Sequence, residues 1–96
     1  MLADDRIRLR HMVDAARTAQ DFVAGRTRAE LDTNRMLLFA VVRAIEVIGE
    51  AAARMSPDGR AALPDLPWPA IIGMRNRIVH AYFDIDHEVV WQTVVG

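Results

Sequence analysis

Apolar residues recur at three- and four-residue steps along the first quarter of the chain. The resulting stripe comprises Leu9, Met12, Val13, Ala16, Ala19, Phe22 and Val23. Apolar residues at this spacing cover one face of an α-helix, so the pattern predicts an amphipathic helix over residues 4–24. Gly25 follows directly. A glycine here suits the left-handed conformation that commonly ends a helix, and we expect the first helix to stop there.

A second and longer helix is predicted to begin near Thr27. Thr27 and Glu30 have the spacing of a capping box, a pattern that starts helices. An apolar seam then repeats every seven residues at Leu31, Leu38, Ile45 and Ala52, interleaved with Asn34, Val41, Ile48 and Met55. A second apolar row, about 100° around the helix axis, comprises Leu37, Ala40, Ala44, Val47 and Ala51. A helix that is apolar over so wide an arc is buried on two sides, which predicts antiparallel bundle packing.

The second half of the chain contains turn signals and two shorter helical patterns. Residues 56–59 read as a turn, and prolines punctuate residues 64–68. Pro69 suits the first turn of a third helix, because its missing N–H has no partner there, and we expect that helix to run to about Ala81.

Asp84 or Asp86 is the expected N-cap of a fourth helix that extends through Val94. The chain shows neither strand-like alternation nor internal repeats. The predicted fold class is therefore all-α, an up-and-down helical bundle of four or more helices. Ninety-six residues allow a single domain over residues 1–96 with a modest core.

Net charge, cysteine content and the length of apolar runs limit the kinds of site and binding partner that the protein can have. The formal net charge is −1, so no overall field draws the chain to nucleic acid, and any such binding must come from a local patch of positive charge. There is no cysteine, which excludes disulfides and thiolate metal sites and fits a reducing cytoplasm. No run approaches the roughly 18–20 apolar residues of a membrane span, and the N-terminus lacks the apolar core of a signal peptide. We expect a cytoplasmic protein with no membrane partner.

The wide apolar arc of residues 31–55 leaves two kinds of partner open. The second apolar row can pack against another helix of the same chain or against a second copy of the chain. We expect a homodimer, because two-fold pairing is the commonest way in which a small domain covers such a face. Ordinary burial inside one bundle is the alternative.

Candidate chemistry is concentrated in residues 75–82, which read RNRIVHAY. Arginine grips phosphate through a planar fork of donors, and histidine moves protons near neutral pH. On an uninterrupted helix Asn76 and His80 share one face. Arg75 and Tyr82 share another face, rotated by about 100°. Arg75 and His80 then lie about 140° apart, so the arginine must curl toward the histidine or the pair must be completed across a dimer. We expect a composite cleft between two third helices.

The pattern Arg-x-x-x-x-His-x-Tyr, with asparagine directly after the arginine, resembles the signature of the HEPN ribonucleases, and of the HepT toxins in particular. The resemblance covers most of residues 27–96. It is carried by the segments Ile48-Gly49-Glu50-Ala51-Ala52, Pro64-Asp65-Leu66-Pro67-Trp68, Gly73-Met74-Arg75-Asn76 and Tyr82-Phe83-Asp84-Ile85-Asp86. It implies a HEPN-like bundle. Relatives of this kind continue into a further acidic and leucine-rich stretch, so we expect the domain to be C-terminally truncated.

The resemblance implies a metal-independent endoribonuclease toxin of a type VII-like toxin–antitoxin system. In the implied reaction an RNA 2′-hydroxyl attacks the adjacent phosphate, and the product carries a 2′,3′-cyclic phosphate. His80 would serve as general base or acid, and Arg75 would neutralise the charge that develops on the phosphoryl oxygens. Asn76 would orient His80 or donate to phosphate. Neither a metal nor a cofactor is expected.

The resemblance also implies a partner and a modification. Tyr82 matches the tyrosine to which a nucleotidyltransferase antitoxin adds AMP, and an anionic group there would block the phosphate site. Two further residues are candidates for supporting roles. For Glu50 the sequence leaves two alternatives open, an exposed charged stripe with a Glu50–Arg54 pair and a carboxylate that faces the motif helix and orients an arginine there. Arg77 is expected to be solvated or to steer phosphate.

Two competing interpretations remain open from the sequence. One is a non-catalytic helical module that binds a nucleotidyltransferase, with Arg75 and His80 as nucleotide ligands. The other is a plain dimerisation domain. Trp68 and Trp91 are expected to anchor the core rather than to stack on bases. No set of residues for reading a base sequence is visible, so the RNA target is not specified.

Overall fold

The structure, a computed structural model, describes residues 1–81 and 84–96, and the side chains of His80 and Ala81 lie outside that description. Along the described residues the elements are α1 (Ala3–Val23), α2 (Glu30–Thr33), α3 (Arg35–Ala53), α4 (Pro57–Ala61), α5 (Trp68–Ile72), α6 (Met74–Ile78), β1 (Val79–Ala81), β2 (Asp84–Ile85) and α7 (His87–Val95). The predicted all-α class is confirmed. A short two-stranded ribbon, which the sequence pattern did not predict, joins the helices.

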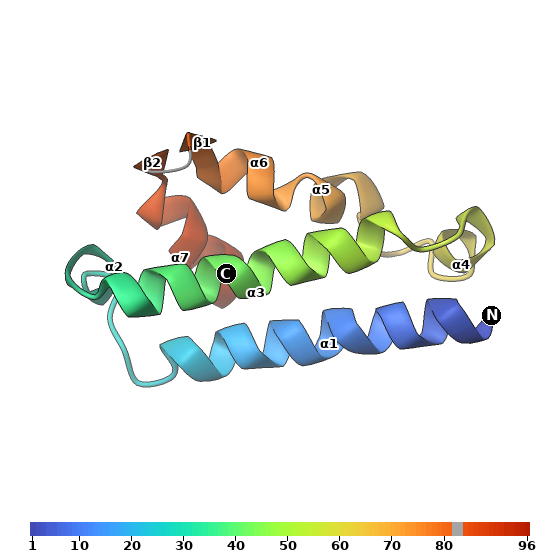
Figure 1. Cartoon of the computed structure of the whole chain (residues 1–96), viewed down its shortest axis with the longest axis horizontal. Helices are drawn as coiled ribbons and strands as arrows, with labels where there is room; N and C mark the ends of the chain where they lie inside the picture. The colour runs from blue at the N-terminus through green and yellow to red at the C-terminus, as the bar shows by residue number, and fades with distance from the viewer. Residues whose placement is uncertain (82–83) are drawn as a thin grey trace.

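The two long helices α1 and α3 lie side by side and antiparallel (Figure 1). Helices α5 and α6 run back along the opposite side of α3, and α7 contacts α1, α3 and α6. Helix α3 is therefore buried on two sides, as its wide apolar arc predicted.

Helices of the same chain bury much of the two apolar rows of α3, although Ala40 and Val47 of the second row are only half-buried. The seven-residue seam forms the centre of the core, and its members Leu38, Ile45 and Ala52 are each at most 7% exposed. In the second row, Leu37 belongs to the same buried cluster as Val23 of α1. Ala51 belongs to the same buried cluster as Met12 of α1. The apolar arc therefore does not by itself require a second copy of the chain.

The predicted end of the first helix and start of the last one are confirmed. Gly25 has a φ of +72°, the left-handed conformation expected after α1. Asp86, one of the two predicted caps, accepts a hydrogen bond from the backbone N–H of Val89 at 3.1 Å and starts α7.

The long helix predicted from Thr27 is interrupted at Asn34. The backbone of Asn34 is extended, and its side-chain oxygen accepts from the N–H of Leu37 at 3.0 Å, which starts α3. Thr27 and Glu30 form half of the predicted capping box, since the Thr27 N–H donates to Glu30 Oε2 at 3.3 Å. They precede only the short α2. A short polar side chain that bonds to the backbone ahead of it favours a helix start over helix continuation, and this explains the break.

The single third helix predicted over residues 69–81 is wrong in its extent. Pro69 does lie in the first turn of α5, as expected. Gly73, with ψ near 0°, separates α5 from α6. Helix α6 then ends at Ile78, three residues before the predicted end.

Beyond α6 the chain forms an antiparallel ribbon. Val79 is extended and pairs with Ile85 of β2. The N–H of Asp86 donates to the carbonyl of Ile78 at 2.8 Å and closes the ribbon against the end of α6. Val79 and Ile85 are β-branched, and such residues pack better on strands than in helices. Cross-strand pairing therefore prevails over the helical spacing that residues 75–82 display.

One carboxylate is buried where α1 meets the turn before α4. Asp5 is 1% exposed and accepts from the N–H of Ser56 at 2.9 Å and from its hydroxyl at 2.5 Å. The Ser56 hydroxyl oxygen in turn accepts from the N–H of Gly59 at 3.0 Å. The hydrogen bonds from Ser56 hold the pKa of Asp5 below its ordinary value. This cluster fastens one end of the molecule.

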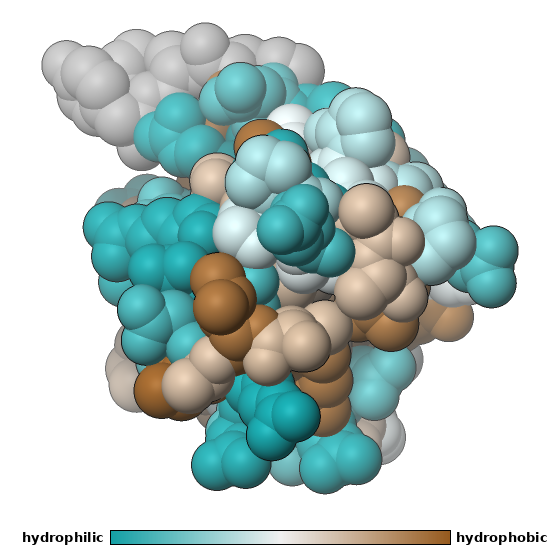
Figure 2. All heavy atoms as spheres, turned by 90° about the vertical axis from the view of Figure 1, so that its right-hand side faces the viewer, coloured by the Kyte–Doolittle hydropathy of each residue, from teal (hydrophilic) through white to brown (hydrophobic). Residues whose placement is uncertain are grey.

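Trp68 anchors the connection before α5, as predicted. It is 7% exposed, and its indole N–H donates to the carbonyls of Arg60 and Leu63. At the end that carries α4 and the N-terminus, hydrophobic and hydrophilic surfaces are interspersed (Figure 2). Among the described residues, none of the helices combines the length and the hydropathy needed to cross a bilayer.

Candidate functional site

Helix α6 displays the first three residues of the motif to solvent. Arg75, Asn76 and Arg77 are all exposed. Ile78 is completely buried among residues of α3 and α7, and Met74, four positions earlier, packs against the same cluster. Residues four apart lie on one face of a helix. The two apolar residues therefore hold α6 against the core, and this turns the polar motif outward.

The acid beside Arg75 is Glu46 of α3, with Arg75 Nε 3.6 Å from Glu46 Oε2. The two side chains are 50% and 30% exposed. An ion pair in such a setting contributes about 1 kcal/mol or less. Its effect is to place the guanidinium along the edge of α3 while leaving it open to solvent.

Glu50, the acid predicted for this role, lies elsewhere. Its carboxylate is 3.2 Å from Arg43 Nη1 on the same helix. The points at which α5 and α6 cross α3 explain the position of Glu50. Gly49 lies against the end of α5, whose carbonyls at Ile71 and Ile72 would be 3.5 Å from an added Cβ. Helix α6 crosses α3 nearer its middle, so Glu46, one turn earlier, meets the motif.

Arg77 and Asn76 take different positions on α6. The guanidinium of Arg77 donates to the carbonyl of Ala70 at 3.2 Å and so ties α6 to α5. The side chain remains exposed, and its phosphate-steering role stays a prediction. The backbone N–H of Asn76 donates to the carbonyl of Gly73.

The remaining predicted site residues lie at or beyond the end of α6. The backbone of His80 is in β1, and its side chain is outside the description. Because the helix ends between Asn76 and His80, their predicted alignment on one helical face is wrong. Tyr82 itself lies outside the described residues.

A network of charged residues holds the start of α7, just after the ribbon. His87 Nδ1 is 2.6 Å from Asp32 Oδ1. Arg28 donates to both oxygens of Asp32 and to Glu88, each at 2.9 Å. Hydrogen bonds from His87 and then from Arg28 lower the pKa of Asp32. The bond from Arg28 is the main cause of the lowered pKa of Glu88. Sequence reasoning missed this network because its members are up to 60 residues apart.

Comparison with known proteins identifies the family. The pattern that defines the family described as "Ribonuclease HepT-like" matches residues 12–95. The chain belongs to the HepT-like ribonuclease family. Helix α6, the ribbon and Glu46 all lie within the matched range.

Several relatives of this HepT-like chain are named as ribonucleases. A "putative RNase" of Methanocaldococcus jannaschii is 35% identical over 83 residues, which cover 86% of this chain and 76% of the relative. A "probable ribonuclease HepT" of Thermococcus cleftensis is 45% identical over 56 residues, 58% of this chain and 51% of the relative. A second "putative RNase" of M. jannaschii is 41% identical over 64 residues, 67% of this chain and 53% of the relative. The chain thus matches about half the length of the latter two. No solved structure matches the chain.

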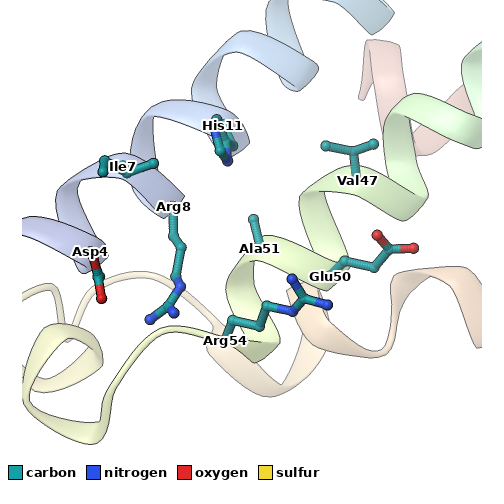
Figure 3. A pocket seen from close by; sticks show the side chains of 8 residues that line it. All are labelled: Asp4, Ile7, Arg8, His11, Val47, Glu50, Ala51 and Arg54. Atoms are coloured by element: carbon teal, nitrogen blue, oxygen red, sulfur yellow. The ribbon is translucent and has the colours of Figure 1, made fainter.

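A groove of about 330 Å³ lies between α1 and α3, on elements that do not carry the motif. Arg8 and His11 project from α1, and Glu50 and Arg54 project from α3 (Figure 3). Asp4 also lines the groove. Because acidic and basic side chains are mixed there, the groove lacks the excess of positive charge that phosphate binding requires. Within the described part of the chain, no cluster of three or more histidine, aspartate or glutamate residues could hold a metal ion.

Proposed function

We propose that this HepT-like chain is a metal-independent endoribonuclease and acts as the toxin of a type VII-like toxin–antitoxin pair. The observation that carries the proposal is the exposed display of Arg75 and Asn76 on α6, with His80 five residues after Arg75, in a chain of a ribonuclease family. An arginine fork supplies phosphate binding, and a histidine supplies proton transfer. RNA is the proposed substrate.

In the proposed reaction the 2′-hydroxyl oxygen of a ribose attacks the adjacent phosphorus. The bond from phosphorus to the 5′ oxygen breaks, leaving a 2′,3′-cyclic phosphate and a 5′-hydroxyl. His80 takes the proton of the 2′-hydroxyl or gives a proton to the departing 5′ oxygen, worth about 10² to 10⁴ in rate. Arg75 stabilises the charge on the phosphoryl oxygens, and Asn76 donates a hydrogen bond to phosphate.

Glu46 makes Arg75 available rather than blocking it. The pair spans 3.6 Å and is half exposed, so it is weak. A phosphate accepts bidentate hydrogen bonds from a guanidinium and can displace such a carboxylate. Glu46 therefore holds Arg75 near the substrate path until RNA replaces it.

We also propose that the chain forms a homodimer. Support comes from a groove of about 460 Å³ between α1 and α3 whose lining includes Ala15, Phe22, Ala40, Ala44 and Val47. Three of these residues belong to the second apolar row of α3, and they leave apolar surface for a partner. Light scattering at micromolar concentration should give about twice the chain mass of 10.8 kDa. A clean monomer would refute a composite site.

RNA cleavage by the purified chain tests the catalytic proposal. Arg75→Ala and His80→Ala should each lower the rate by at least about 100-fold while helical content is unchanged. Arg10→Ala is the matched control, because it removes an exposed arginine of α1 that lies outside the motif, and it should retain most activity. Cleavage should survive EDTA. Loss on chelation with recovery on zinc addition would contradict the metal-free mechanism, and nucleotide binding without cleavage would favour a nucleotide-presenting module.

Addition of AMP to Tyr82 by a nucleotidyltransferase antitoxin is the proposed control. Support comes from the motif resemblance and from the closeness of Tyr82 to Arg75 along the chain. Tyr82→Phe keeps the ring and removes the attachment oxygen, so it should stay active yet resist neutralisation by the partner with ATP. Mass spectrometry should show one adenylyl group on the parent alone. Equal modification or equal silencing of the variant would place control elsewhere.

A further inference from the structure

A groove of about 430 Å³ lies beside the ribbon, between the starts of α3 and α7. Small-molecule sites in proteins commonly have volumes of about 300–1,000 Å³. Its lining includes Asp32 of α2, Arg35 and Phe39 of α3, Ile85 of β2 and His87 of α7. Four separate elements thus meet around one space.

The aromatic ring of Phe39 is exposed at this groove. The Phe39 side chain is 54% exposed, although phenylalanine usually lies in the core. The guanidinium carbon of Arg35 is 6.0 Å from the centre of the ring, within the range of a cation–π contact. The groove therefore offers a flat apolar face and a cation together.

The opposite wall of the groove is polar and held in place. Asp32 is bonded to both Arg28 and His87, which restricts its orientation. A carboxylate accepts, so the ring nitrogen Nδ1 of His87 donates to Asp32. The other ring nitrogen of His87, Nε2, and the remaining lone pairs of the Asp32 carboxylate are then available for hydrogen bonds to a ligand. These are groups that can pair with the edge of a base.

The groove is connected to the two parts of the motif through Ile85 of β2 and Phe39 of α3. Ile85 in its wall pairs with Val79, the residue directly before His80. Phe39 is seven residues before Glu46, the partner of Arg75, so the two lie on the same edge of α3, about 10 Å apart along the axis. A strand of RNA whose phosphate meets Arg75 can therefore place a neighbouring nucleotide over Phe39.

We propose that this groove binds one base of single-stranded RNA next to the scissile phosphate, an inference that rests on the proposed ribonuclease function. The base stacks on Phe39, Arg35 covers the stack or holds the adjoining phosphate, and Asp32 and His87 meet the edge of the base. Stacking of bases on aromatic rings and arginine planes is the common mode of single-strand recognition. A protein partner fits less well, because the centres of protein interfaces are depleted in charged residues.

The test measures binding apart from chemistry. The probe is a short single-stranded RNA with 2′-O-methyl groups throughout, which removes the attacking hydroxyl, and binding is followed by fluorescence anisotropy. Phe39→Ala should weaken binding by about 5- to 150-fold, to which a stacking energy of about 1–3 kcal/mol per base converts. Phe39→Tyr keeps a ring and should bind within about threefold of the parent. Arg35→Gln should reduce the slope of log affinity against log salt by about 0.7.

Met36→Ala is the matched control, since Met36 is a neighbouring apolar side chain that is 85% exposed. It should leave RNA affinity unchanged. Equal affinity for Phe39→Ala and the parent, or equal losses for Phe39→Ala and Met36→Ala, would overturn the base site. So would a Phe39→Ala protein that loses its dimeric mass and its affinity together, because the face would then be a contact between copies. A parent that binds the probe through Phe39 but cleaves no RNA would refute the proposed function and leave the base site standing.

Discussion

Ile78 connects the motif to the core, and replacing it tests how the site is supported. Its side chain is 0% exposed, in a cluster with residues of α3 and α7. Ile78→Ala removes three buried carbons, which at about 0.8 kcal/mol each amounts to about 2.4 kcal/mol. The cavity left behind adds to this, so we expect a loss of about 3–4 kcal/mol in the free energy of unfolding. A 96-residue chain has roughly 5–14 kcal/mol in total, so the variant should still fold.

In urea unfolding followed by circular dichroism, this loss should appear as a lower midpoint urea concentration, with a similar dependence of the unfolding free energy on urea. Ile78→Val removes one carbon and should cost about 0.5–1.5 kcal/mol. Ile7→Ala is the control, because Ile7 of α1 is 51% exposed and the same deletion there should stay within about 0.5 kcal/mol. If Ile78→Ala and Ile7→Ala shifted the midpoint equally, α6 would not be anchored by Ile78 and the outward display of Arg75 would lose its explanation.

Two further predictions concern the cluster around Asp5 and the acid-sensitive network. A Cβ at Gly59 would lie 2.6 Å from Asp5 Oδ2, which Ser56 holds in place, so Gly59→Ala should cost about 1–3 kcal/mol in the urea assay. An unchanged midpoint would show that this cluster is not tightly packed. The pKa values of Asp5, Asp32 and Glu88 are lowered from ordinary values of 3.8, 3.8 and 4.5, so the unfolded chain binds protons more readily. The stability that these three carboxylates contribute is complete at pH values above their ordinary pKa values. It is lost as the pH falls through their pKa values in the folded state. Melting temperature should therefore drop between about pH 5 and pH 2, and less steeply in Ser56→Ala. Equal slopes for that variant and the parent would contradict the assigned cause.

The long helices could be predicted because their signals are local. The spacing of the apolar stripe of α1, and Gly25 after it, depend only on neighbouring residues. The heptad seam of α3 is also visible in the sequence, and burial of Leu38 and Ile45 confirms it. The break at Asn34 was missed because the same asparagine occupies a position of the seam. A side chain that suits both a helix interior and a helix cap leaves the boundary undecided until packing is known.

The end of α6 could not be predicted from residues 75–82 alone. Their spacing fits a helix, and the strand conformation of Val79 depends on its pairing with Ile85. The choice of Glu46 over Glu50 beside Arg75 likewise depends on where α5 and α6 cross α3. Both features arise from contacts between segments that are distant along the chain, and periodicity does not encode such contacts.

Phe39 shows what a helical pattern contains beyond its core positions. It falls in neither apolar row of α3, and this off-pattern position is the signal that could have identified it as an exposed ring. The same edge of α3 carries Glu46 two turns later, so one helix sets the spacing between the ring and Glu46, the partner of Arg75. The backbone of His80, in contrast, lies in β1, which pairs with β2 directly before α7. Its position therefore depends on contacts between separate segments, whereas a single helix sets the register of Phe39 and Glu46.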